Sequence, residues 1–139
     1  FENSMFDAVV CSEVLEHLSD DQLALGLNEI ARILRPGGKL HGTVPANEDL
    51  TSSKVACPEC GVVFHRWGHQ QSFSMDKLSD VLELVGTPSI RQKIFTHWPS
   101  LNWKGRIIAA VRTVTLSMGI SGTGRSFYFV ARKHSKESH

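Results

Sequence analysis

The chain has 139 residues, which is the length of one ordinary domain. Hydrophobic residues make up 41% and charged residues 21%, a composition that excludes a wholly disordered or collagen-like chain. The formal net charge of +1 argues against binding to nucleic acid or membranes through overall charge. The three cysteines are too few for a disulfide framework, so we expect a reducing compartment and a cytoplasmic protein.

The first third of the sequence predicts a strand, a helix and a second strand. Residues 5–11 form an almost wholly apolar run, which predicts a strand buried on both faces. Ser19 begins a capping box, and apolar residues follow at helical spacing. The Arg-Pro-Gly-Gly run at 35–38 is expected to end this helix, and residues 39–44 predict the second strand.

The rest of the chain begins with residues 46–72, which show no clear period and predict a loop insertion containing Cys and His. Four further elements are predicted, namely a helix at 75–85, a strand at 90–95, a helix within 99–119 and a strand at 126–132. Alternating strands and helices predict an α/β fold with a largely parallel sheet.

Two segments carry a resemblance to a known family. Residues 6–17 resemble the fourth strand and following turn of class I S-adenosylmethionine-dependent methyltransferases, and residues 34–40 resemble that family's turn into strand five. The resemblance implies a partial Rossmann-like sheet, with strands four to seven and their helices, over residues 1–133 and a polar tail at 134–139. The family's N-terminal half, with its Gly-rich cofactor loop, would precede Phe1, and Gly122-x-Gly124 lies too late in the chain to replace it.

The same resemblance implies an activity and a cofactor for the intact parent enzyme. The parent would transfer a methyl group from S-adenosylmethionine to a hydroxyl or other nucleophile of a small molecule or an RNA. Cys11, Ser12 and Glu13 match the positions that line the cofactor's amino-acid end. We expect no membrane partner, an inactive isolated chain, and a first strand whose open edge another chain could complete.

Glu13, Glu16 and His17 fall within one helical turn, so their side chains can converge. Two carboxylates and one imidazole favour Mg²⁺ or Mn²⁺ over zinc. The Glu-x-x-Glu-His pattern is similar to a metal site of methyltransferases that act on small RNAs and of those that O-methylate phenols in ubiquinone synthesis. That similarity implies His69 as a further ligand. The open alternative is a segment without a metal, in which His17 packs internally.

Cys57, Cys60, His65 and His69 form a second candidate cluster. Their Cys-x2-Cys-x4-His-x3-His spacing resembles a compact zinc knuckle, and zinc would order a loop that lacks hydrophobic periodicity. Unligated thiols and a redox Cys-x-x-Cys are the alternatives. His69 cannot easily serve both metals, so zinc could be held by the two thiols and His65. A second hypothesis is therefore a zinc-stabilised, non-catalytic binding module around residues 57–69.

Overall fold

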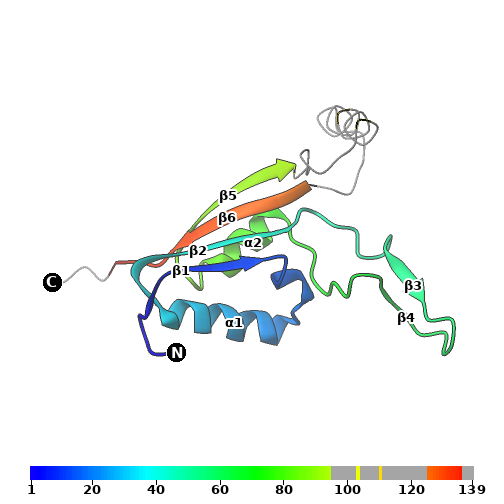
Figure 1. Cartoon of the computed structure of the whole chain (residues 1–139), viewed down its shortest axis with the longest axis horizontal. Helices are drawn as coiled ribbons and strands as arrows, with labels where there is room; N and C mark the ends of the chain where they lie inside the picture. The colour runs from blue at the N-terminus through cyan, green and yellow to red at the C-terminus, as the bar shows by residue number, and fades with distance from the viewer. Residues whose placement is uncertain (95–102, 104–109, 111–124, 136–139) are drawn as a thin grey trace.

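A computed structural model describes residues 1–94, Trp103, Ala110 and residues 125–135. The described elements, in chain order, are β1 (Phe6–Ser12), the 3-10 turn η1 (Leu15–His17), α1 (Asp20–Ile33), β2 (Leu34–Pro45), β3 (Lys54–Ala56), β4 (Val63–His65), α2 (Met75–Leu82), β5 (Thr87–Ile94) and β6 (Arg125–Arg132). Figure 1 shows α1 running alongside β1 and β2, while β3 and β4 form an arm that projects away from the main sheet.

The main sheet has the strand order β1-β2-β6-β5. β1 and β2 are parallel, whereas β6 is antiparallel to both of its neighbours. The α/β class is therefore confirmed, but the expectation of a largely parallel sheet is wrong, because the sheet is mixed. Along β6 the buried residues Phe127, Phe129 and Ala131 alternate with less buried ones, which is the pattern of an antiparallel strand covered on one face.

The core lies between the sheet and the two helices. α1 contributes Leu23 and Leu27, α2 contributes Leu78 and Leu82, and all four are buried in one cluster with residues of β2 and β6. The prediction that β1 is buried on both faces is wrong, since Val10 is 76% exposed. The reason is that Ala8 and Val10 lie on one face of β1 and are exposed, while Val9 and Cys11 on the other face contact the core, so the described elements cover only one face of this strand.

The boundary between α1 and β2 differs from the prediction. The capping box is confirmed, because the Ser19 hydroxyl accepts from the Gln22 backbone N–H and the Gln22 side chain accepts from the Ser19 N–H. α1 ends at Ile33, and β2 begins at once rather than at residue 39. The pairing of β1 with β2 jumps from Leu34 to Lys39, so residues 35–38 bulge out of the ladder instead of separating the two elements.

The segment 46–72 is more ordered than a loop insertion. β3 and β4 pair in antiparallel fashion within it, with Lys54 opposite His65 and Ala56 opposite Val63. The predicted helix at 99–119 and the Gly122-x-Gly124 loop fall outside the described residues, apart from Trp103 and Ala110. Among the described helices, none has the length and apolar character needed to span a membrane.

Candidate metal and cofactor site

The candidate site lies beyond the carboxyl ends of the two parallel strands. Residues 13–17 follow β1, and residues 46–48 follow β2. Open α/β sheets bind their ligands at this edge, because the loops that leave parallel strands gather there. The fold therefore brings two sequence segments to one place, and the segment after the β3–β4 arm supplies a third.

Backbone hydrogen bonds attach that third segment to η1. The N–H groups of Gln70 and Gln71 both donate to the Glu16 carbonyl, at 2.7 and 3.0 Å. The Gln70 side-chain amide donates to the His17 carbonyl at 2.7 Å. As a result the rings of His17 and His69 meet edge to face, with centroids 4.7 Å apart. His17 and His69 are 52 positions apart in the sequence, so only the folding of the chain brings their rings together.

Glu16 is the most unusual residue of the site. It is only 1% exposed, and neither of its carboxylate oxygens has a hydrogen-bond partner. Burial raises the pKa of the Glu16 carboxyl above its ordinary value, and the nearby Glu13 charge adds to this, while its own backbone N–H and the imidazoles of His17 and His69 oppose it. One ligand atom from each of Glu16, His17 and His69 lies within 4.8 Å of the others.

Three of the four predicted carboxylate-site residues are therefore brought together, and Glu13 is not among them. Glu13 is exposed and belongs to neither group of closely spaced ligand atoms in the described residues. Its backbone has a φ of 54°, in the left-handed region that a residue with a side chain rarely adopts. The chain turns sharply at this residue, so Glu13 and Glu16 do not share the single helical turn that their spacing predicts.

A second group contains Glu48, His65 and His69. Glu48 Oε2 lies 2.5 Å from His69 Nδ1, and Glu48 Oε1 lies 3.6 Å from His65 Nε2. The rings of His65 and His69 stack with centroids 4.8 Å apart. Sequence reasoning missed Glu48. Its signal would have been an acidic residue directly after the second predicted strand, at the edge where parallel strands end.

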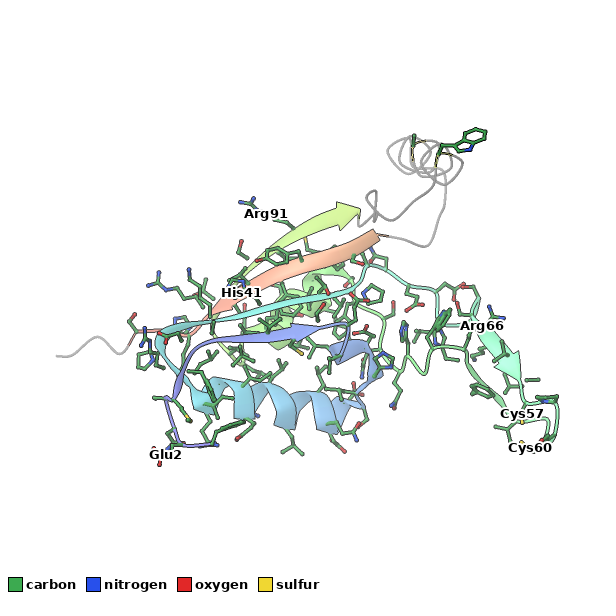
Figure 2. All side chains as sticks on the ribbon, viewed as in Figure 1. Glu2, His41, Cys57, Cys60, Arg66 and Arg91 are labelled. Carbon is green, nitrogen blue, oxygen red and sulfur yellow. The ribbon has the colours of Figure 1, made fainter. Side chains whose placement is uncertain are left out.

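Cys57 and Cys60 lie at the tip of the arm, as Figure 2 shows. The Cys57 N–H donates to the Val62 carbonyl, and the Gly61 N–H donates to the Cys57 carbonyl, each at 2.9 Å. Backbone N–H groups of Cys60 and Glu59 donate to the Cys57 sulfur and lower the pKa of its thiol, and the Cys60 thiol contributes as well. This arrangement suits a thiolate.

The structure does not bring these thiols to the histidines. Neither cysteine shares a group with His65 or His69 among the described residues. The pairing of β3 with β4 explains this, because His65 lies opposite Lys54 at the inner end of the arm while the cysteines follow Ala56 at its outer end. The predicted knuckle of Cys57, Cys60, His65 and His69 is therefore not the arrangement found.

The predicted cofactor residues all lie at the carboxyl end of β1. The hydroxyls of Ser12 and Thr43 are 2.6 Å apart, and the Glu13 N–H donates to the Thr43 carbonyl at 2.9 Å. Cys11 is buried, and this burial raises the pKa of its thiol, which disfavours a role as a nucleophile. The end of β1 is thereby held to β2, with the Glu13 side chain on the surface.

Comparison with known proteins tests the family resemblance of the first part of the chain. Residues 1–41 match the family model described as a methyltransferase domain. The resemblance of the first strand, the turn and the second strand to S-adenosylmethionine-dependent methyltransferases is thus confirmed. No curated protein matches the sequence.

Solved methyltransferase structures share the fold at low sequence identity. An S-adenosylmethionine-dependent methyltransferase from Methanosarcina mazei is 15% identical, with a TM-score of 0.63, and the match covers 98% of this chain and 63% of that one. The 1,6-didemethyltoxoflavin-N1-methyltransferase of Burkholderia thailandensis, solved with S-adenosylhomocysteine, is 14% identical, with a TM-score of 0.59 and coverages of 97% and 47%.

A third match is a chain in the complex of the Haloferax volcanii Trm112 methyltransferase activator with a methyltransferase. It is 19% identical, with a TM-score of 0.57, and the match covers 100% of this chain and 58% of that one. The chain therefore spans less than two thirds of these three structures and has the fold of part of a methyltransferase.

Proposed function

We propose that this chain is part of an S-adenosylmethionine-dependent methyltransferase that acts on a hydroxyl group of a small molecule or an RNA, beside a divalent cation. The observation that carries the proposal is the Glu16 carboxylate, which is buried without a hydrogen-bond partner next to His17 and His69. A buried carboxylate is costly unless a cation or a hydrogen-bond donor compensates it. The methyltransferase match over residues 1–41 supports the transferred group.

Cys11, Ser12 and Glu13 are proposed to line the amino-acid end of the cofactor. They fit this role because they lie at the carboxyl end of a parallel strand, where the Glu13 carboxylate is exposed and can accept hydrogen bonds from a cationic amino group. When bound, S-adenosylmethionine supplies an electrophilic methyl group. The bond between the Ser12 and Thr43 hydroxyls would fix the strand end against which the cofactor lies.

Glu16, His17 and His69 are proposed to hold the cation. With Glu13 outside the group, the donor set is one carboxylate and two imidazoles, which suits Mn²⁺ better than Mg²⁺, because Mg²⁺ prefers oxygen ligands. A bound divalent cation would lower the pKa of a hydroxyl that coordinates to it. The side chains of this site would orient the acceptor towards the cofactor residues after β1.

Titration of the chain with Mn²⁺, followed by the loss of the free-ion electron paramagnetic resonance signal, tests the cation site. We expect the wild type to bind Mn²⁺ and His17→Ala to bind it at least about tenfold more weakly, because one ligand is lost. His41→Ala is the matched control, since His41 hydrogen-bonds the Tyr128 hydroxyl and belongs to neither ligand group. An unchanged free-ion signal with the wild type would contradict the cation site.

Methyl transfer requires a separate measurement on the chain extended by its preceding coding sequence. We expect the extended protein to bind S-adenosylmethionine and to form S-adenosylhomocysteine with phenol or ribose hydroxyl acceptors, and we expect a chelator to reduce the rate. Failure to bind S-adenosylmethionine would overturn the methyltransferase proposal. Full activity in the presence of the chelator would overturn only the role of the cation.

The arm supports a second, independent candidate. We propose that Cys57 and Cys60 are two thiolate ligands of a zinc ion whose other ligands lie outside the two histidine groups. The backbone N–H groups that point at the Cys57 sulfur favour this function over unligated thiols. If the longer protein binds zinc but not S-adenosylmethionine, the non-catalytic binding module becomes the better description.

A Cys57→Ser, Cys60→Ser double variant tests this zinc site. We expect the purified wild type to contain zinc by elemental mass spectrometry and the double variant to contain none. Mn²⁺ binding at Glu16, His17 and His69 should be unchanged, because the thiols do not contribute to that group. Equal zinc content in the two proteins would show that the thiols are not ligands.

A further inference from the structure

The contacts of Glu48 support an inference that rests on the proposed cation site and extends it. The Glu48 carboxylate contacts two histidines, His65 and His69, and all three side chains are at most 13% exposed, so little water competes for their hydrogen bonds. The Ser72 hydroxyl donates to the backbone carbonyl of Glu48 at 2.6 Å and so holds the Glu48 backbone in place. The Nδ1 atoms of His65 and His69 each have one hydrogen-bond partner, and these partners indicate which ring nitrogen carries the proton.

His65 is defined by its bond to the backbone. The backbone N–H of His69 donates to His65 Nδ1 at 3.1 Å, so His65 Nδ1 is an acceptor and carries no proton. In the neutral ring the proton is then on Nε2, which is buried and faces Glu48 Oε1 at 3.6 Å. A nitrogen that carries a proton cannot bind a metal ion, so neither nitrogen of His65 is free to be a ligand.

His69 is defined by its bond to Glu48. A carboxylate can only accept, so at 2.5 Å from Glu48 Oε2 the His69 Nδ1 carries the proton and donates it. The lone pair of the ring is then on Nε2. His69 also belongs to the group with Glu16 and His17, whose ligand positions do not involve Glu48.

We propose that Glu48 is a positioning residue that holds His69 in the tautomer needed to bind a cation through Nε2, together with Glu16 and His17. The cluster of five side chains therefore binds one cation rather than two. Carboxylate groups that accept the second N–H of a metal-binding histidine fix its ring orientation and increase its basicity in other proteins. His65 stacks on the same ring.

Nitrogen-15 NMR of the metal-free chain tests the tautomers without any metal. We expect His69 to be protonated at Nδ1 and His65 at Nε2, and we expect Glu48→Ala to remove the preference of His69 for Nδ1. Protonation of His69 at Nε2 in the wild type would overturn the inference. Because no metal is present, this result is independent of the proposed cation site.

Mn²⁺ titration supplies the second readout. Glu48→Ala should raise the dissociation constant by about 10- to 100-fold while one ion per chain is still bound. Glu48→Gln, whose amide oxygen can still accept from Nδ1, should have an intermediate effect and guards against a folding defect in the alanine variant. Glu83→Gln, an exposed residue after α2, is the control.

The outcomes separate the two proposals. Two ions bound to the wild type and one to Glu48→Ala would make Glu48 a ligand and overturn the positioning role. An unchanged affinity in both Glu48 variants would overturn it as well. If the wild type binds no Mn²⁺, the cation site fails, whereas the tautomer measurement still decides whether Glu48 orients His69.

Discussion

Replacement of Glu16 by Gln is expected to abolish the stabilisation of the chain by Mn²⁺. A ligand present at 100 times its dissociation constant stabilises the folded state by about 2.7 kcal/mol, provided that it binds only the folded state. Gln has nearly the same shape as Glu but lacks the charge that the cation requires. The melting temperature of the wild type should therefore rise with Mn²⁺, and that of Glu16→Gln should stay constant.

The same variant should behave in the opposite way without metal. In the wild type the buried Glu16 carboxylate has no hydrogen-bond partner. Replacing it by an uncharged amide should therefore stabilise the metal-free chain by something on the order of 1 kcal/mol at neutral pH. Glu83→Gln, in which an exposed carboxylate is replaced, should change neither quantity. An equal Mn²⁺-dependent rise in melting temperature for Glu16→Gln and the wild type would remove Glu16 from the site.

The raised pKa of Glu16 adds a pH dependence to the metal-free chain. Burial raises the pKa of this carboxyl above its ordinary value of about 4.5, so the folded state binds the proton more tightly than the unfolded chain does. The resulting stabilisation is complete below pH 4.5 and is lost as the pH rises through the folded-state pKa. Urea unfolding in the presence of a chelator should show the wild type losing stability relative to Glu16→Gln over this window.

The second large effect is expected for Gly42→Ala. Gly42 is buried in β2, between β1 and β6, and an added Cβ would lie 2.1 Å from the Cys11 carbonyl oxygen and 2.4 Å from Phe129 Cζ. The Cys11 oxygen belongs to the backbone of β1, so it cannot move without disturbing the β1–β2 ladder. We expect a loss of about 3 kcal/mol or more in the free energy of unfolding.

Gly26→Ala in α1 is the matched control for that substitution. Its Cβ would meet only Leu18 Cδ1, at an ordinary contact distance of 3.9 Å. Because alanine favours the helix more than glycine does, this variant should gain about 1 kcal/mol. Urea denaturation of both variants measures the difference. If Gly42→Ala unfolds within 1 kcal/mol of the wild type, the close packing of β2 against β1 and β6 is wrong.

Local sequence signals were sufficient for most elements of the fold. The capping box at Ser19, the apolar spacing in α1 and α2, and the four strands of the main sheet could be predicted because each depends on residues close together in the chain. The short strands β3 and β4, which lie in the segment predicted as a loop insertion, were not predicted. The direction of β6 and the exposure of β1 could not be predicted either. They depend on which strand lies beside which, and a buried strand has a similar composition whether its neighbour is parallel or antiparallel.

The candidate site divides in the same way. Sequence alone determined the family resemblance, the proximity of Glu16 to His17, and the Cys57–Cys60 turn, because a few consecutive residues set each of them. Only the tertiary structure decided that His69 meets Glu16 and Glu48, that Glu13 turns away, and that the thiols lie apart from the histidines. The physical reason is that hydrogen bonds from Gln70 and Gln71 to Glu16, and the pairing of β3 with β4, join residues whose separation along the chain carries no periodic signal.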